Sequence, residues 1–384
     1  MNILIYNFKN TYIMGDCVEC FISMGHKVDV QRLELEQSCY ENDICEYRIK
    51  KQLKKNKYDA VFTVNYYPVT AKVCNQLQIL YLSWQYDSPP NLPSTDTLDY
   101  PTNRIFFFSK FDCSYYRALG IDNAFYLPLA SNWRKIQNAA KFDEGFRSDV
   151  SLVGSLYKSP LPELKALMSD EQSKYLDAVI SVQLKYHGCK VVDESLTPEF
   201  VSSICEHYKS LSETAVQPTR AELFYAVCSH ITRLERISLL RLSAALCDTA
   251  LYAVSVDDDE KEMLKGVNIR KAVDYTSEMP RVFNSSKINL NPVLRANRSA
   301  IPLRALDIMA SKGFMLTSGQ SEFENFFEKD TEYVCYENIY DAMEKIKFYL
   351  ENDEQRQRVV WRAFERIKKD FNYEDRINIM LELI

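Results

Sequence analysis

The sequence lacks any apolar run of about 18 residues, the length that a membrane-spanning helix needs. Its first residues, MNILIYNFKN, are interrupted by Asn7 and Lys9 and contain no small-residue cleavage site, which argues against a signal peptide. Basic residues are not in surplus either, because 47 Lys and Arg stand against 53 Asp and Glu, a formal charge of −6. Neutralising nucleic-acid phosphates requires a basic surface, so we expect no nucleic-acid partner. A local basic pocket for one small phosphorylated ligand remains compatible with this charge.

Disulfide, metal and dinucleotide patterns are missing as well. The 11 cysteines are odd in number and follow no framework, which is typical of a reduced cytoplasmic protein. Neither GxGxxG nor GxxxxGK[ST] occurs, so a bound dinucleotide or a Walker-type phosphate loop has no support. The four histidines form no HxxxH or HExxH pair; they are His26, His187, His207 and His230. We therefore expect a cytoplasmic protein with no metal and no resident cofactor.

Three further patterns each allow two interpretations. Cys17-Val-Glu-Cys20 has the spacing of a redox or metal motif, but it stands alone, and two thiols packing on one helix face explain it better. Asp257-Asp-Asp259 could hold a divalent ion against a diphosphate, or it is a charged loop. The basic stretch from Arg48 to Lys55 is either a solvated helix face or a binding patch, and the first is favoured.

What the sequence does contain is the composition of a globular protein, with 46% hydrophobic and 26% charged residues over 384 positions. This length suggests two or three domains. In the first third, short apolar runs alternate with helical stretches. The predicted strands are 2–6, 27–30, 58–64, 79–84, 104–109 and 124–127. Continuous apolar strands separated by helices indicate a parallel sheet covered on both faces, and such sheets place ligands at the carboxyl ends of their strands.

The second part of the chain repeats this alternation around a helical elaboration. Residues 130–148 have no clear period and are interpreted as a linker. A strand over 149–154 then opens a helical stretch from Ser159 to about Cys247. Strands return at 250–256, 287–290 and 314–317, with a helix over 302–311 and mostly helix afterwards. The prediction is an α/β protein of two domains, 1–145 and 146–384, with a helical insertion at about 159–247 and a last helix that could pack back on the first domain.

The segment from Lys287 to Gln320 carries the most chemical information. A strand runs into a polar loop that holds Asn289, Asn291, Arg295 and Arg298, and Pro302 then opens a helix. The free N–H groups and partial positive charge of a helix N-terminus suit a phosphate. Arg304 in the first turn could grip a diphosphate, and Asp307, one turn deeper, could accept hydrogen bonds from ribose hydroxyls. The alternative is an i,i+3 ion pair on the surface, which spacing alone favours.

Several segments resemble, in order along the chain, the landmarks of one enzyme group. They are 82–89 (LSWQYDSP), 106–109 (FFFS), 125–130 (FYLPLA), 149–155 (DVSLVGS), 286–291 (SKINLN) and 301–309 (IPLRALDIM). The group is the GT-B glycosyltransferases related to the spore-maturation protein CgeB, whose Trp-x-x-Asp-x-Pro segment the first of these resembles. The resemblance covers most of the chain and bears on fold and class more than on substrate.

This resemblance implies two Rossmann-like parallel-sheet domains that face a cleft, with a nucleotide-diphosphate sugar bound by the second. Arg304 would contact the diphosphate and Asp307 the ribose, while Gly154 and Ser155 would approach the donor through backbone N–H groups. The remaining donor-side residues of this set are Asn289, Asn291 and Arg298. Many GT-B enzymes place a Glu eight residues before the ribose-binding acid, where this chain has Ser299. That departure leaves donor and stereochemistry open.

The expected function is therefore transfer of a sugar from a nucleotide-diphosphate donor, a co-substrate, to an unidentified acceptor without a metal ion. Asp87 follows a predicted strand and is the first candidate for the base, with Asp16 second. Trp84 and Tyr86 would form a sugar-stacking wall on the acceptor side. Alternatively, Asp87 caps its own turn. The competing functions are a nucleotide-sugar epimerase on the same scaffold and a non-catalytic sugar-nucleotide or glycan-binding module.

Overall fold

The computed structural model describes residues 1–9, 11–33, 43–90, 92, 94–186 and 190–384. The chain divides into two compact units. Unit 1 comprises Met1–Asn132, Arg298–Leu303 and Ile367–Ile384, and unit 2 comprises Trp133–Asn297 and Arg304–Arg366. Each unit is built around a parallel sheet of six strands. Within the described residues, no helix is long and apolar enough to cross a membrane.

The sheet of unit 1 has the strand order β2-β1-β3-β4-β5-β6, and all its pairs are parallel. Its strands are β1 (Asn2–Asn7), β2 (Lys27–Arg32), β3 (Ala60–Val64), β4 (Leu80–Trp84), β5 (Asn103–Phe107) and β6 (Ala124–Tyr126). The apolar runs make the central strands β3 and β4 almost wholly buried. The sequence therefore predicted this sheet correctly, because strands covered on both faces are apolar throughout.

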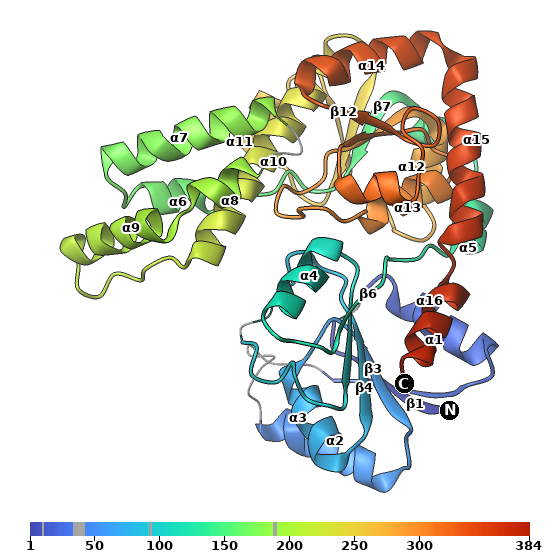
Figure 1. The fold of residues 1–384 in the computed structure, drawn as a ribbon. Helices are drawn as coiled ribbons and strands as arrows, with labels where there is room; N and C mark the ends of the chain where they lie inside the picture. The colour runs from blue at the N-terminus through green and yellow to red at the C-terminus, as the bar shows by residue number, and fades with distance from the viewer. Residues whose placement is uncertain (10, 34–42, 91, 93, 187–189) are drawn as a thin grey trace. The chain divides into compact units, whose positions relative to one another are not determined.

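Helices cover both faces of this sheet (Figure 1). They are α1 (Met14–Ser23), α2 (Asp43–Lys55), α3 (Pro68–Leu77), α4 (Lys110–Ala118) and α16 (Tyr373–Glu382). Buried side chains of α2, α3 and α4 form one core with Leu4, Tyr81 and Phe107 of the strands. On the opposite face, Phe21 of α1 packs edge-on against Phe62 of β3, with 5.3 Å between ring centroids.

The sheet of unit 2 has the order β12-β11-β10-β7-β8-β9 and is also parallel throughout. Its strands are β7 (Ser148–Val153), β8 (Thr249–Ala253), β9 (Asn268–Lys271), β10 (Ser286–Asn291), β11 (Met315–Ser318) and β12 (Val334–Tyr336). The helices and short 3-10 turns around it are α5 (Trp133–Ala139), η1 (Glu144–Phe146), α10 (Arg220–Ala244), α11 (Asp258–Met263), α12 (Met279–Ser285), α13 (Leu303–Ala310), η2 (Ser321–Asn325), α14 (Ile339–Glu351) and α15 (Asp353–Asp370). Residues of α10, α14 and α15 share one core with the strands.

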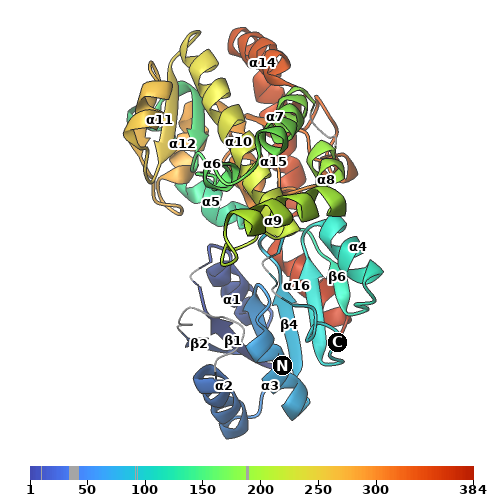
Figure 2. The same cartoon turned by 90° about the vertical axis from the view of Figure 1, so that its left-hand side faces the viewer.

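The helical insertion has a hydrophobic core of its own. It consists of α6 (Leu161–Lys165), α7 (Asp170–Lys185), α8 (Val191–Ser195) and α9 (Pro198–Leu211), which pack on the N-terminal half of α10. Figures 1 and 2 both show these helices extending from unit 2 beside α10. Capping boxes begin α7 at Ser169 and α10 at Thr219, as the Thr219-x-x-Glu222 pattern predicts.

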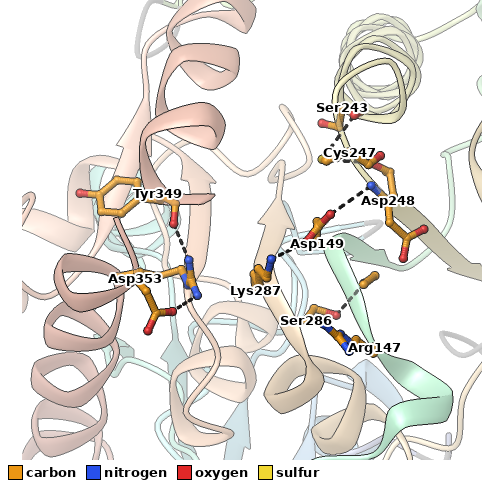
Figure 3. A network of polar contacts seen from close by, with 12 residues as sticks. Arg147, Asp149, Ser243, Cys247, Asp248, Ser286, Lys287, Tyr349 and Asp353 are labelled. Atoms are coloured by element: carbon orange, nitrogen blue, oxygen red, sulfur yellow. Dashed lines mark hydrogen bonds and ion pairs between the residues drawn. The ribbon is translucent and has the colours of Figure 1, made fainter. Parts of the chain in front are cut away.

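Polar contacts tie the amino ends of the strands of unit 2 together (Figure 3). Lys287 Nζ lies 2.8 Å from Asp149 Oδ1, and Asp149 Oδ2 accepts a hydrogen bond from the backbone of Asp248. Ser148 and Ser286, the first residues of β7 and β10, join through their hydroxyls. These contacts fix strand register at the edge of the sheet opposite to the edge where parallel sheets bind ligands.

The structure corrects several details of the predicted elements. The segment interpreted as a linker contains α5, and its residues pack with unit 2, since Asp143 accepts a hydrogen bond from Arg281 and its backbone N–H donates to Ser285. The first segment of unit 1 ends at Asn132, whereas the sequence placed the domain boundary after residue 145. The edge strands β9 and β12 were not predicted, because β9 is exposed and polar and β12 has only three residues. The last helix, α16, belongs to unit 1 and packs against α1.

Candidate functional site

The loop after β7 has a strained backbone at the carboxyl edge of the second sheet. Gly154 has φ +147°, and Tyr157, a residue with a side chain, has φ +61°. Positive φ costs free energy in a residue other than glycine, and such strain gathers at binding sites. A Cβ on Gly154 would lie 3.3 Å from Arg236 Nη1. The absence of a side chain at Gly154 thus allows the loop to approach Arg236 closely. The side chain of the next residue, Ser155, is exposed.

Arg236 of α10 lies beneath this loop and is only 9% exposed. Its Nη1 donates to the carbonyl of Ser155 at 2.5 Å, and its Nη2 donates to the carbonyl of Pro292 at 2.7 Å, so it joins the loops that follow β7 and β10. The guanidinium also lies over the ring of Tyr157, 4.6 Å from its centroid. Among the described residues, no carboxylate forms an ion pair with it, and its Nε has no partner. A buried positive charge is thus held by neutral groups.

Burial lowers the pKa of the Arg236 guanidinium, because removal from water disfavours the charged form. The nearby charge of Arg304 lowers this pKa further, while Tyr157, Glu235 and Tyr336 oppose the shift. An arginine nevertheless stays charged in proteins. Two arginines that repel each other at the carboxyl edge of a parallel sheet would both gain from an anion bound there.

A second buried network fixes the loop that follows β10. Glu235, which has no exposed surface, forms an ion pair with Arg295, with 3.0 Å between Oε2 and Nη2. Its Oε1 accepts a hydrogen bond from the hydroxyl of Tyr336 on β12 at 2.7 Å. The hydroxyl of Thr232 accepts from the backbone N–H of Arg295. Residues on one face of α10 therefore hold this loop in place, and the sequence had not singled out α10 for any such role.

Arg304 and Asp307 do not form the surface ion pair that their spacing suggested. Arg304 lies over the ring of Phe283, 5.6 Å from its centroid, and contacts the sulfur of Met279. Asp307 is only 1% exposed, and its Oδ1 accepts a hydrogen bond from the hydroxyl of Tyr275 at 3.0 Å. The carboxylate thus already receives a hydroxyl from the loop after β9. A ribose hydroxyl would have to join or replace the hydroxyl of Tyr275.

The two asparagines of β10 both form hydrogen bonds with groups of the protein. Asn289 is buried, accepts from the hydroxyl of Ser151 at 2.8 Å and donates to the carbonyls of Phe283 and Phe314. Asn291 donates to the hydroxyl of Thr317 on β11. Their predicted contact with a donor is wrong for Asn289, whose oxygen and nitrogen both bind protein groups. Asn291 lies at the last position of β10 and is 4% exposed.

Gly313 is tightly enclosed by these same groups. A Cβ at this position would lie 2.8 Å from Asn289 Nδ2 and 2.8 Å from the carbonyl oxygen of Phe283, a backbone atom that cannot swing away. We expect Gly313→Ala to lower the free energy of unfolding by about 1–3 kcal/mol, the usual cost of overpacking a core. Urea denaturation of the variant and the wild type measures this difference in the free energy of unfolding.

Gly15 in α1 provides the matched control, because a Cβ there would meet nothing within 4 Å. Gly15→Ala should raise the free energy of unfolding by roughly 0.4–1 kcal/mol, because alanine fits this backbone conformation and restricts the unfolded chain more than glycine does. Equal stability of Gly313→Ala and the wild type would contradict the tight packing described around Asn289.

In unit 1, Asn65 holds Asp87 at the carboxyl ends of β3 and β4. Asn65 adopts a left-handed conformation with φ 66°, and its Nδ2 donates to Asp87 Oδ2 at 2.8 Å. Its Oδ1 accepts from the backbone N–H of Tyr86 at 2.7 Å. Asp87 is exposed, so its carboxylate is held by a neighbouring strand and remains open to solvent. This hydrogen bond joins Asp87 to the residue that follows β3 rather than to the backbone of its own turn.

Trp84 does not form a wall for a sugar. Its side chain has no exposed surface, its Nε1 donates to the carbonyl of Leu127, and its ring packs edge-on against Tyr373 of α16. The expectation of stacking is therefore wrong for Trp84, because both faces of a parallel sheet are covered and Trp84 belongs to the buried run of β4. Tyr86, two residues later, is half-buried at the end of the strand.

The remaining candidates lie in unit 1. Asp16, in the first turn of α1, is half-buried and accepts a hydrogen bond from Asn132 at 2.9 Å. Arg298 lies over the ring of Phe111, 4.8 Å from its centroid. Ser299, which stands where many GT-B enzymes have a glutamate, accepts from the backbone N–H of Phe111 and contacts the hydroxyl of Ser109. Arg298 and Ser299 therefore contact the start of α4.

The possible metal motifs have other roles. Asp257 caps α11 through a capping box with Glu260, and Asp258 forms an ion pair with Lys261. Cys17 and Cys20 are buried free thiols, and burial raises the pKa of Cys17. Within the described residues, no group of three or more His, Cys, Asp or Glu is placed to hold a metal ion. His187 lies outside the described residues.

Three residues that shape these sites were missed in the sequence. Arg236 lies inside a helix whose apolar pattern explains it as a packed position, and Tyr275 lies in an exposed loop. Asn65 carried a usable signal, because asparagine directly after a strand tolerates the left-handed conformation better than most residues.

Comparison with known proteins agrees with this architecture. A family described as glycosyl transferase-like matches residues 242–382, which lie mainly in unit 2. No curated protein matches the chain. Among solved structures, sucrose-phosphate synthase from Thermosynechococcus elongatus has a TM-score of 0.59 at 11% identity, covering 100% of this chain and 98% of that one. HepE of Anabaena, solved with UDP, has 0.58 at 9%, covering 100% of both chains.

A putative UDP-N-acetylglucosamine 2-epimerase from Listeria monocytogenes is also similar, with a TM-score of 0.52 at 8% identity, covering 99% of this chain and 94% of that one. At these identities the likeness bears on the fold alone. The chain has the α/β fold of the GT-B type, with two Rossmann-like parallel-sheet units.

Proposed function

We propose that this protein is a glycosyltransferase that moves a sugar from a nucleotide-diphosphate donor to an acceptor hydroxyl. The observation that carries the proposal is the buried guanidinium of Arg236 at the carboxyl edge of the second sheet, which forms an ion pair with no described carboxylate. The match of residues 242–382 to a glycosyl transferase-like family supports it, and so does the fold. HepE, which is similar in fold, was solved with UDP and with UDP-glucose.

The donor would bind unit 2 through its diphosphate. Arg236 and Arg304 supply two positive charges, and the Gly154–Ser155 backbone can approach a phosphate closely because glycine has no side chain. Asp307 would accept from the ribose once Tyr275 makes room. With two arginines to stabilise the leaving diphosphate, the proposed reaction needs no divalent metal.

The transfer itself requires loss of a proton from the acceptor. In the proposed step the carboxylate of Asp87 takes this proton as the acceptor oxygen bonds to the anomeric carbon. The bond from that carbon to the diphosphate breaks, and the nucleoside diphosphate leaves with the electron pair. Asp16 is the second candidate for the base, and Tyr86 is the candidate for an acceptor-side contact. Stereochemistry, sugar and acceptor are not assigned.

A ligand panel tests the donor half of this proposal. Thermal shift with nucleoside diphosphates, nucleotide-sugars, nucleosides and free sugars should show stabilisation by the first two classes only, because binding to the native state raises its stability by mass action. Calorimetry then gives affinities, and Arg304→Ala should weaken the binding of every diphosphate ligand. If no diphosphate compound stabilises the protein, the proposed donor class is wrong.

An epimerase is the second candidate, because one structure of similar fold carries that description. Epimerisation needs acid and base side chains around the sugar and no acceptor. It predicts that the sugar-nucleotide alone is converted to an isomer, whereas a transferase releases nucleoside diphosphate only when an acceptor is present. A non-catalytic binding module would do neither and would tolerate the loss of Asp87.

A further inference from the structure

Helix α2 of unit 1 has an outer face that combines positive charge with exposed apolar side chains. Ile44 and Tyr47 are 67% and 65% exposed, so most of the surface of each side chain is in contact with water. Arg48, Lys51, Lys54 and Lys55 are exposed as well. Positions 44, 47, 48, 51, 54 and 55 recur at three- and four-residue intervals, so they lie on one side of the helix. We call these six residues the α2 face.

The opposite side of α2 is a normal core face. Cys45, Ile49 and Leu53 are buried against the sheet and α3. Lys50 and Glu46 point to α3, where both bind Gln76. The helix is therefore firmly attached to unit 1 by its inner side, and the α2 face is not needed for folding. In Figures 1 and 2 this helix lies beside α3 at the outside of the unit.

The positive charges of the α2 face are not neutralised by the described part of the chain. No described side chain forms an ion pair or hydrogen bond with Arg48, Lys51, Lys54 or Lys55, and Asp43 is the one acid of the helix that is exposed near them. Salt screens charges beyond roughly 8 Å under physiological conditions, so this local surplus acts despite the net charge of −6.

We propose that the α2 face binds the surface of a lipid bilayer that contains anionic lipids. Lysines and arginines in one row match the negative headgroups, which need no fixed geometry. Ile44 and Tyr47 suit the boundary between headgroups and acyl chains. Tyrosine is enriched there, and the side chain of Ile44 would be buried away from water. A nucleic acid offers phosphates too, but it has no apolar layer for Ile44. This inference is independent of the proposed enzymatic function.

Flotation of the full-length protein with vesicles tests this proposal. The vesicles contain phosphatidylcholine alone or with about 30% phosphatidylserine, at about 50 mM and about 300 mM salt. We expect binding to the anionic vesicles at low salt, much weaker binding at high salt, and almost none to phosphatidylcholine alone. Absence of binding to anionic vesicles at low salt, or equal binding to both kinds of vesicle, would overturn the proposal.

Two sets of substitutions locate the surface. The variant R48Q/K51Q/K54Q/K55Q should lower the partition coefficient by several hundred-fold, because each of the four basic residues contributes roughly five-fold. The control K174Q/K185Q/K209Q/K265Q removes the same charge from exposed positions of unit 2 and should stay within about two-fold of the wild type. Equal losses in both variants would show that only total charge matters and would contradict the proposal.

Ile44→Ser with Tyr47→Ser tests the apolar part, and it should lower binding about ten-fold or more, given the transfer free energies of two such side chains. Unchanged binding would contradict contact with the acyl boundary. Far-UV circular dichroism and melting curves check that the variants fold, as expected for exposed positions. If a single-stranded RNA binds through the same four cations while anionic vesicles do not, the occupant is nucleic acid and the proposal is wrong.

Discussion

Replacing Asp87 by asparagine is expected to lower the turnover of sugar transfer by about 10²-fold or more while leaving nucleotide affinity unchanged. Asparagine keeps the size of the side chain, and its amide oxygen can still accept the hydrogen bond from Asn65 Nδ2. It cannot accept a proton at neutral pH. The measurement is release of nucleoside diphosphate with saturating donor and acceptor, together with calorimetry of nucleotide binding.

Asp122→Asn is the matched control for this change. Asp122 is also an exposed aspartate of unit 1, but it precedes β6 and therefore lies at the amino edge of the sheet. Its substitution should leave turnover within about two-fold of the wild type, as for most exposed positions. If Asp87→Asn turns over at nearly the wild-type rate, Asp87 is not the base, and Asp16 or the leaving phosphate takes the proton.

Replacing Arg236 by glutamine is expected to weaken the binding of every nucleoside diphosphate by about 2–3 kcal/mol, or roughly 30- to 150-fold in Kd. The variant loses the charge that we propose to contact the phosphates, and it also loosens the loops after β7 and β10, which Arg236 joins. Arg236→Lys keeps the charge but cannot donate to both carbonyls as a fork, so its affinity should lie between those of wild type and Arg236→Gln.

Arg241→Gln on the same helix serves as the control, because Arg241 is exposed and lies near the C-terminal end of α10. It should change neither nucleotide affinity nor stability beyond about 0.5 kcal/mol. Urea denaturation of Arg236→Gln separates a binding defect from unfolding. If folded Arg236→Gln binds nucleotides with wild-type affinity, Arg236 does not contact the diphosphate and the proposed donor site is wrong.

The elements that the sequence predicted best are the buried parallel strands. Runs such as Leu80–Trp84 are apolar at every position, and this follows from coverage of both sheet faces. The same physical fact places Trp84 in the core, so the sequence already contained the evidence against a sugar-stacking role. β9, with the sequence Asn-Ile-Arg-Lys, has no such signal because it lies at an exposed edge.

The site was harder to predict because its residues come from elements far apart in the chain. Arg304 and Asp307 were identified from one short segment, but Arg236 belongs to a long helix whose pattern predicts only packing. Its position under Gly154 depends on the tertiary fold. Likewise, the bond from Tyr275 to Asp307 joins a loop to a helix over 32 residues of chain, and no local pattern indicates it.

The most direct test of glycosyl transfer is a mass measurement of the products. The purified protein is incubated with nucleotide-sugars that bind it and with a mixture of candidate acceptors, and both nucleotide and acceptor are analysed by mass spectrometry. We expect free nucleoside diphosphate and an acceptor heavier by one glycosyl unit, in equal amounts, and much less of both with Arg236→Gln at a donor concentration below its raised Kd. Bound nucleotide-sugar that is converted to an isomer without any acceptor, or that stays unchanged with every acceptor, would contradict glycosyl transfer.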